Sequence, residues 1–392
     1  MATITSEIAP ETNAREAILT PSMVALSGMM LCAMSSFYLL LSALPAHAAA
    51  LGGDLAAGLV TGLMMAATIG GELAAPRFIA RIGRRPALAV ALMMMATPCL
   101  ISFSGSLPLV LLGCVARGLG LGVLLVAACG FATLLAPPTR RAEALGVYGV
   151  ASAIPAIICV PLGPWALAQF GPAPMAVITA ALALAGLAGL AMLPRIATRS
   201  EDGGHAHSLP ALRFAIWPAV SLAIGAVIVG ATVTFLPIAH PEAGQGTIML
   251  ALLIQGLASA TARWAAGRPI DRRGPQGAAI GGVGLALVAT ALLALPGSVA
   301  VIAGMAMSGI AFGVLQSATL AQLMARTTPA QVDGAGALWN GAYDAGLGIG
   351  GLAFGVLAPS LGYAASFVIT AVGLSLVAFL VFHRFEAQRT SC

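Results

Sequence analysis

The chain is organised around long apolar runs that are almost free of charge. Such runs recur from residue 22 to residue 383, and only 8% of all residues are charged. A helix of about 20 apolar residues crosses the roughly 30 Å hydrocarbon core of a bilayer, whereas a soluble domain has about 25% charged residues. The runs are continuous rather than alternating, which disfavours a transmembrane β-barrel. The sequence therefore predicts an all-α integral membrane protein.

Proline, glycine and arginine residues divide the apolar runs into twelve expected membrane helices. We place these helices near residues 22–44, 55–76, 86–104, 108–134, 143–169, 173–194, 214–238, 247–267, 277–295, 298–325, 333–358 and 362–383. The longest polar segment separates six helices from six. The predicted organisation is a tail, a six-helix bundle, a central loop, a second six-helix bundle and a second tail, at residues 1–20, 21–194, 195–213, 214–384 and 385–392.

The arginine residues predict how these helices are oriented in the membrane. The chain has no lysine, and every arginine except Arg117 lies in a tail, in the central loop or near the loops that follow the even-numbered helices. The loops after the odd-numbered helices contain none. Positive residues favour the cytoplasmic side, so both termini are expected to be cytoplasmic. The arginine-, alanine- and glycine-rich composition suggests a GC-rich genome, and hence a bacterial cytoplasmic membrane.

An internal repeat relates two of the arginine-rich segments. A shift of 191 residues aligns AAPRFIARIGRR (residues 74–85) with AAGRPIDRRGPQ (residues 265–276), and six of the twelve positions are identical. Both segments follow the second helix of their half. A repeat at half the chain length implies two bundles related by an axis along the membrane normal.

These two segments resemble a signature of the major facilitator superfamily, G-x-L-A-D-R-x-G-R-R. The first copy has Pro76 and Ala80 where the signature has glycine and aspartate, and it keeps Arg81, Gly83, Arg84 and Arg85. The second copy lacks the final basic pair and keeps Gly267, Asp271, Arg272 and Gly274. The resemblance covers residues 20–385. It implies the family's fold, twelve transmembrane helices in two pseudo-symmetric six-helix bundles.

The signature residues suggest a cytoplasmic latch between the two halves. Glycine permits a tight turn, and the arginines of such a loop can reach a carboxylate or helix-terminal carbonyls of the opposite half. Glu72, about one turn from the cytoplasmic end of helix 2, is expected to belong to this latch. The alternatives are loops that are merely positive and, for Glu72, a direct proton carrier or a carboxylate that snorkels to the surface.

Helices 4 and 5 carry further likenesses to the family. Family members often have an arginine linked to proton coupling at the place of Arg117, although the usual glutamine three residues later is Gly120 here. Gly163 and Pro164 resemble the Gly-Pro-containing stretch of helix 5 in drug/proton antiporters. The resemblance thus favours the efflux branch of the family.

Asp344 lies in an otherwise apolar and glycine-rich helix. From the helix rise we expect Asp344 about 16 Å deep from one side of the membrane and Arg117 about 14 Å deep from the other. A charge at the bilayer centre costs at least about 2.5 kcal/mol, and burial disfavours the charged form of a carboxyl group. We therefore predict that Asp344 exchanges a proton during transport, with Arg117 as its expected partner. The alternative is a structural hydrogen-bonded group between helices 2 and 11.

Several polar and aromatic residues could contact a substrate near Asp344. Asn340 shares its helix face, and Trp339 and Tyr343 form a neighbouring face. The remaining candidates are Gln255, Gln316 and Tyr38. Each of these three has helix packing through hydrogen bonds as its alternative role.

Other classes of function lack their motifs. The chain has no G-x-x-x-x-G-K-[ST] phosphate-binding loop, no nucleophile–base set and no metal-ligand spacing. We expect no enzyme, cofactor, metal or nucleic-acid partner.

The leading prediction is a secondary active transporter that exports a small amphiphilic or apolar organic compound by alternating access, driven by protons and functional as a monomer. The alternatives are import of a small metabolite by proton symport or uniport, and a non-transporting membrane sensor or scaffold.

Overall fold

The computed structural model describes residues 18–137, 140–195, 215–328 and 332–389. Most of the expected first tail and nearly all of the expected central loop lie outside the described residues, whereas residues 385–389 of the expected second tail continue α12. The elements are α1 (Pro21–Ile82), α2 (Arg84–Ala96), α3 (Cys99–Ser102), α4 (Leu107–Leu135), α5 (Arg141–Phe170), α6 (Pro172–Met192), α7 (Ile216–Ala239), η3 (Pro241–Ala243), α8 (Gly244–Arg273), α9 (Pro275–Leu293), α10 (Ser298–Met324), α11 (Val332–Leu361) and α12 (Tyr363–Arg389).

The first helix supplies two membrane crossings. Its 62 residues would extend about 93 Å at 1.5 Å per residue, three times the thickness of a bilayer core. The helix bends at Gly52 and Gly53, whose dihedral angles are not helical, and Gly53 has φ +71°, which favours glycine. This bend separates a first leg, residues 21–51, from a second leg, residues 54–82.

The described chain contains ten helices that are long and apolar enough to cross a membrane, with α1 counted once and α2 merged with α3. The second leg of α1 and the apolar part of α12, Tyr363–Val377, bring the crossings to the predicted twelve. The fold class predicted from the sequence is therefore confirmed.

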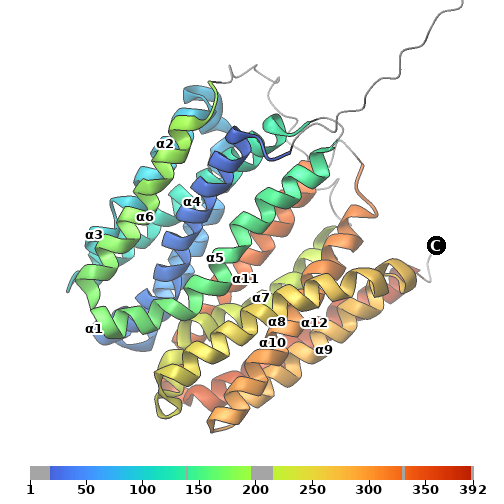
Figure 1. Cartoon of the computed structure of the whole chain (residues 1–392). Helices are drawn as coiled ribbons and strands as arrows, with labels where there is room; N and C mark the ends of the chain where they lie inside the picture. Colours follow the sequence, from blue (N-terminus) through green and yellow to red (C-terminus); the bar gives the residue numbers. More distant parts are fainter. Residues whose placement is uncertain (1–17, 138–139, 196–214, 329–331, 390–392) are drawn as a thin grey trace, which may run out of the picture.

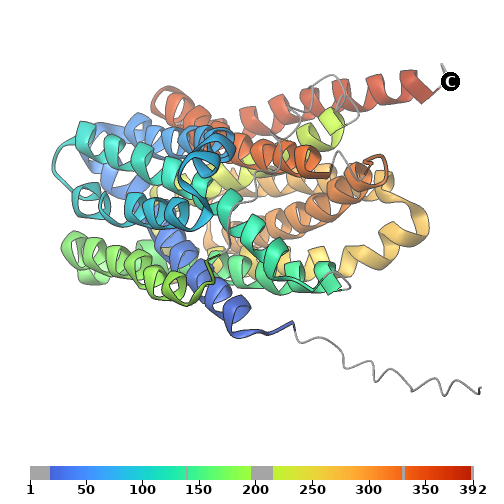
Figure 2. The same cartoon turned by 90° about the horizontal axis from the view of Figure 1, so that it is seen from above.

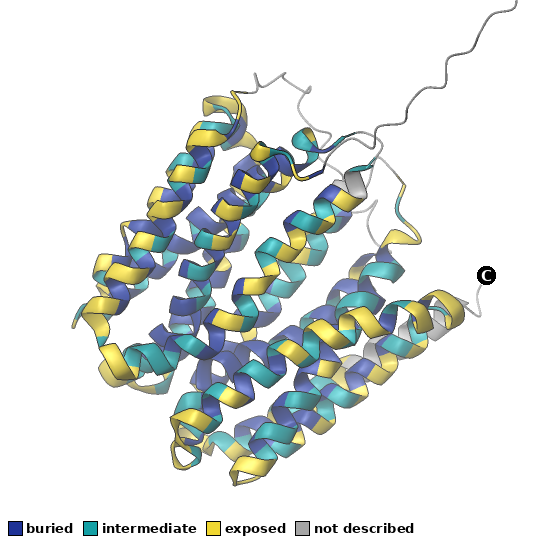
Figure 3. Cartoon of the chain, in the orientation of Figure 1, coloured by how far each residue is buried: buried dark blue, intermediate teal, exposed yellow. Residues whose placement is uncertain are grey.

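The helices form two bundles that lie side by side (Figures 1 and 2). Helices α1 to α6 pack on one another, as do α7 to α12, and the bundles meet where α1 contacts α7 and α11 and where α5 contacts α8. Buried residues lie along the faces where helices pack (dark blue in Figure 3). Exposed apolar side chains such as Leu112, Val177 and Leu376 cover outer surfaces that suit lipid.

The repeated segments are helical, contrary to the expected helix ends near residues 76 and 267. The second leg continues to Ile82 and α8 continues to Arg273. Only one turn residue follows in each copy, Gly83 with φ +89° and ψ 157° and Gly274 with φ +80° and ψ 160°. Charge ends a membrane crossing without ending a helix, because arginine is a good helix former. The two glycines share one conformation, as the repeat predicts.

We name the two ends of the molecule by their turns. The arginine-rich end contains the turns at Gly83 and Gly274, and the arginine-free end contains those at Gly53, Gly171 and Gly362.

Glycines on α11 allow it to pack closely on α7. A Cβ on Gly346 would lie 2.6 Å from the carbonyl oxygen of Ala223, and a Cβ on Gly350 would overlap the carbonyl oxygen of Val227. Small residues let helix backbones approach closely inside a membrane. This α11 face is therefore fixed within the second bundle.

Candidate functional site

Asp344 lies on α11 near the boundary between the two bundles. Its side chain is buried, with 8% of its surface exposed. In the described part of the chain its carboxyl group has no hydrogen bond and no ion pair. Tyr38 on the first leg and Tyr343 on α11 lie within electrostatic range of it. The charged side chain within that range is another carboxylate, Glu72 on the second leg.

Aromatic side chains from three helices surround this region. The ring of Tyr343 stacks on Phe312 of α10 at a centroid distance of 5.6 Å and an interplanar angle of 27°. Trp339 donates a hydrogen bond of 3.0 Å from its indole nitrogen to Thr319 Oγ1, also on α10. The ring of Tyr38 meets Phe37 edge-on at 5.2 Å. The structure thus places Glu72, which the sequence assigned to the cytoplasmic latch, within electrostatic range of Asp344, together with Tyr343 and Tyr38 of the predicted substrate site.

Arg117 does not pair with Asp344 in this structure. The side chain is completely buried, at 0% exposure. Its guanidinium donates to the carbonyl oxygen of Met95 and to Cys99 Sγ, and to the carbonyl oxygen of Ser36 at 3.0 Å. These bonds join α4 to three other segments of the first bundle. The expected pairing rested on depth alone, and depth does not determine which way a helix face points.

The two glutamines and Asn340 differ in their surroundings. Gln255 is buried and donates to Thr232 Oγ1 at 3.4 Å and to Ser308 Oγ at 3.3 Å, which joins α8 to α7 and α10. This is the helix-packing role named as its alternative. Gln316 is half-buried on α10, and Asn340 is exposed on α11.

The second leg of α1 packs against α11 toward the arginine-free end. A Cβ on Gly58 would lie 2.6 Å from the carbonyl oxygen of Gly351, and a Cβ on Gly355 would lie 2.8 Å from the carbonyl oxygen of Asp54. These contacts join the two bundles, so they must separate if the arginine-free end opens.

Two hydrogen bonds also hold the two bundles together toward the arginine-free end. The hydroxyl of Tyr363 on α12 donates to Asp54 Oδ1 at 2.7 Å. The hydroxyl groups of Thr61 and Thr234 lie 2.8 Å apart, between the second leg and α7. The sequence does not reveal either pair, because Asp54 and Tyr363 are 309 residues apart and Thr61 and Thr234 are 173 residues apart. The available signal was Asp54 itself, an acidic residue beside a turn.

The bundles diverge toward the arginine-rich end, as the ribbons of α5 and α8 show in Figure 1. The contacts between the bundles named above lie toward the arginine-free end, and we call this arrangement closed at that end and open at the arginine-rich end.

The proposed latch residues do not meet across the bundles in this conformation. Arg81, Asp271 and Arg272 are exposed. Arg85 donates at 3.1 Å to the carbonyl oxygen of Ala191, and Arg84 lies against Gly130, both within the first bundle. Since the arginine-rich end is open here, this arrangement leaves the latch a prediction for the opposite state.

The Gly-Pro pair of α5 has a packing role. A Cβ on Gly163 would lie 2.5 Å from the carbonyl oxygen of Leu39 and would overlap Ser42. Gly163 therefore allows α5 to contact the first leg of α1. Pro164 follows it and lines a cavity between the bundles.

Comparisons with solved structures identify the fold. The nucleoside transporter NupG has a TM-score of 0.74 at 14% identity, over 94% of this chain and 100% of that chain. A bacterial homolog of the human lysosomal transporter Spinster, in an inward-facing and unoccupied conformation, has a TM-score of 0.75 at 15% identity, over 92% and 95%. The xylose transporter XylE from E. coli, in a partially occluded inward-open conformation, has a TM-score of 0.72 at 17% identity, over 93% and 97%.

These neighbours are nucleoside, spinster-like and xylose transporters, and they do not single out the drug-efflux branch. No curated protein matches the sequence. The profile of the family described as Major Facilitator Superfamily matches residues 26–301, most of the chain. The chain therefore belongs to the Major Facilitator Superfamily, as a multi-pass secondary transporter of small molecules and not an enzyme.

Proposed function

We propose that this transporter exports a small apolar or amphiphilic organic compound in exchange for protons. It works as a monomer in a bacterial cytoplasmic membrane, with both termini in the cytoplasm. The arginine-rich end is then the cytoplasmic end, and the structure described above is the inward-facing state. The observation that carries the proposal is the carboxyl group of Asp344, buried at the bundle boundary without a positive partner in the described part of the chain.

Such a carboxyl group is stable in the membrane mainly as the neutral acid. The ionised form lacks water and lacks a paired cation, and either would be needed to offset the cost of burying the charge. The nearby carboxylate of Glu72 adds repulsion between like charges. Because Glu72 and Asp344 belong to different bundles, this repulsion and the access of water change when the bundles rock. The site then binds and releases a proton once in each cycle.

The surroundings of Asp344 favour an uncharged or weakly polar cargo. Trp339, Tyr343 and Phe312 supply aromatic surface, which binds flat apolar groups well. The buried Arg117 is held by groups of its own bundle, so it does not provide a free cation for an acidic or phosphorylated substrate. A cargo that enters beside Asp344 competes with its proton, which couples the two fluxes.

A second candidate is import of a small metabolite by proton symport or uniport. The likeness in fold to nucleoside and xylose transporters favours it. The two candidates differ in the direction in which a proton gradient drives the cargo.

The test is transport in proteoliposomes with an imposed proton gradient. Efflux is followed with the dye Hoechst 33342, and uptake with radiolabelled uridine and xylose. The parent protein should drive dye transport uphill and should dissipate the gradient when dye is added. Asp344→Asn keeps the size and hydrogen bonding of the side chain but cannot titrate. It should lose gradient-driven transport and retain downhill exchange.

The matched control is Glu242→Gln, which neutralises an exposed carboxylate in η3 and should leave coupling intact. Unchanged uphill transport by a well-expressed Asp344→Asn protein would refute proton coupling at this residue. A variant that fails to fold would support the structural role instead. Uphill uptake of uridine or xylose by the parent would establish the second candidate.

A further inference from the structure

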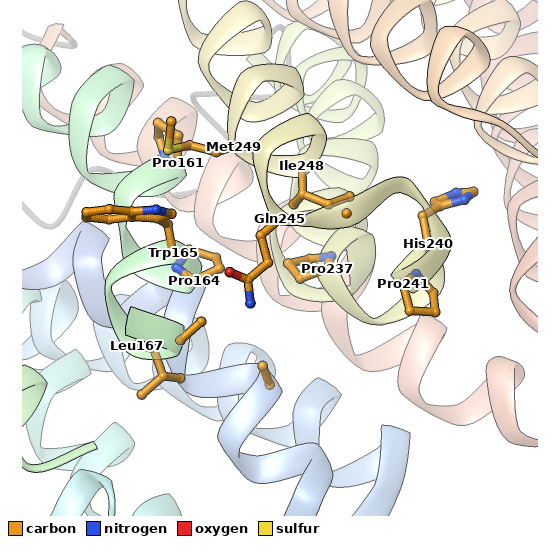
Figure 4. A pocket seen from close by; sticks show the side chains of 13 residues that line it. Pro161, Pro164, Trp165, Leu167, Pro237, His240, Pro241, Gln245, Ile248 and Met249 are labelled. Carbon is orange, nitrogen blue, oxygen red and sulfur yellow. The ribbon is translucent and has the colours of Figure 1, made fainter. Parts of the chain in front are cut away.

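A cavity of about 340 Å³ lies between the two bundles toward the arginine-free end. Figure 4 shows its lining, which comes from α1 and α5 of the first bundle and from α7, η3 and α8 of the second. None of Asp344, Tyr343, Tyr38 and Glu72 lines it. Its volume lies in the range of pockets that hold small organic ligands, about 300–1,000 Å³. The cavity is therefore a site separate from the one around Asp344.

The walls of this cavity are rigid and mainly apolar. Pro161, Pro164 and Trp165 of α5 face Pro237 of α7 across it. A proline side chain has almost no rotamer freedom to lose. The ring of Trp165 is held edge-on against Phe170 at 5.8 Å. A preformed aromatic and proline-lined wall lowers the entropic cost of binding a flat ligand.

Two neutral polar groups belong to the lining of this cavity, the indole N–H of Trp165 and the side-chain amide of Gln245. The side-chain amide of Gln245 extends between the α5 wall and Pro237 (Figure 4), and an amide offers both a donor and an acceptor. His240, also in the lining, is 7% exposed and already engaged at both ring nitrogens. Its Nδ1 lies 3.1 Å from Glu242 Oε1 and its Nε2 lies 3.3 Å from the carbonyl oxygen of Leu293. The described lining can therefore form hydrogen bonds with a ligand, but it offers the ligand no charged side chain that lacks a partner.

We propose that this cavity binds a small, uncharged, mainly aromatic compound that holds the arginine-free end closed. The aromatic and proline walls match a flat ring system, and Gln245 matches one hydrogen-bonding substituent. Both bundles form the walls, so the cavity exists only while the bundles meet at this end. The proposal goes beyond the exporter function, because it does not depend on what is carried beside Asp344.

Because both bundles form the cavity, a bound ligand should favour the conformation in which the bundles meet at the arginine-free end. A ligand shifts a conformational equilibrium only through its different affinity for the two states. Here one state has the complete cavity, and the other separates the α5 wall from the α7 and α8 wall. A bound compound therefore acts as an inhibitor of the conformational cycle, from the side opposite to the opening seen in this structure.

The test uses the full-length protein in lipid nanodiscs with the neutral fluorescent probe N-phenyl-1-naphthylamine. Its emission is measured on direct excitation, with empty nanodiscs subtracted. Gln245→Trp and Met249→Trp each place an indole in the cavity, and Trp165→Ala removes one wall. We expect saturable binding by the parent, weakened at least about tenfold in the three cavity variants. The control is Trp264→Ala, because Trp264 is 83% exposed near the other end of α8; it should bind as the parent does.

A second readout measures the conformation directly. In a protein carrying Thr61→Cys, maleimide should modify the new thiol more slowly when the probe is bound, and this slowing should disappear when Gln245→Trp is added. Equal probe binding by the parent and all cavity variants would overturn the proposal, as would binding that leaves the labelling rate unchanged. Competition identifies the ligand class: displacement by carbazole supports an aromatic ligand. Displacement only by a short-chain diacylglycerol would assign the cavity to lipid and contradict the proposal.

Discussion

Replacement of Gly58 by alanine should shift the transporter away from the state closed at its arginine-free end. The new Cβ would lie 2.6 Å from the carbonyl oxygen of Gly351 and 3.1 Å from the Cα of Gly355, both in the opposite bundle. A normal carbon–oxygen contact is about 3.4 Å, so the second leg and α11 would have to move apart by roughly 0.8 Å. Neither neighbour can yield by a change of rotamer, because both contacts are backbone atoms.

The size of the shift follows from the cost of overpacking. Forcing an extra methyl group into a well-packed contact costs about 1–3 kcal/mol, and here that cost applies only to the closed state. The equilibrium should therefore move about 5- to 150-fold toward the state open at this end. Alanine also favours a helix by about 1 kcal/mol over glycine, but this gain is the same in both states and cancels from their ratio.

The assay is the rate at which maleimide modifies a cysteine placed at Thr61, read by mass spectrometry of that peptide in purified protein. Gly58→Ala should raise the rate by the factor given above. Gly70→Ala is the matched control on the same leg, because its Cβ would meet the nearest atom, Leu119 Cδ2, at 3.8 Å. Equal labelling rates in the two folded variants would refute the reasoning. So would a loss of folded protein confined to Gly58→Ala, since the contact would then matter in every state.

Three further predictions address closure, folding and orientation. Tyr363→Phe removes the hydroxyl that donates across the bundles and should increase maleimide labelling at the same cysteine without lowering the thermal stability; an unchanged rate would contradict a role in closure. Arg117→Leu leaves the acceptors in the first bundle without their donor, so the yield of folded protein and its Tm should fall, whereas normal stability would contradict a structural role. Cysteines introduced at Ser106 and Ala243 should react with an impermeant maleimide in intact cells, and labelling only after permeabilisation would reverse the orientation.

The sequence was sufficient to place the helices along the chain. Proline, glycine and arginine mark where an apolar run stops, and most expected helices agree with the observed bounds to within a few residues. The largest differences are at the ends of four segments. The first leg runs to residue 51 instead of 44 and α12 to Arg389 instead of 383, and the second leg and α8 continue through their arginines to Gly83 and Gly274. Interfacial arginines are compatible with a helix, so their charge indicates the membrane surface and not the helix end.

The side-chain contacts of the site were harder to predict from the sequence than the positions of the helices. Helix rise gave Asp344 and Arg117 similar depths, but the direction in which each side chain points depends on how the helices pack. Asp344 faces the bundle boundary near Glu72, whereas Arg117 points into its own bundle. Hydrogen bonds between the bundles, such as that between Asp54 and Tyr363, join residues that are far apart in the sequence. A short-range sequence pattern does not show which of these distant residues meet.

Substitutions of glycines in α11 should give two different phenotypes, depending on which face of the helix they occupy. Gly346 and Gly350 face α7 inside their own bundle, whereas Gly348, Gly351 and Gly355 face the second leg of the other bundle. A side chain added to the first face disturbs a contact present in all conformations, so it reduces the amount of protein in the membrane. A side chain added to the second face disturbs a transient contact, so the protein persists with altered turnover. Scanning mutagenesis along this one helix should therefore alternate, with helical periodicity, between loss of expression and change of transport rate.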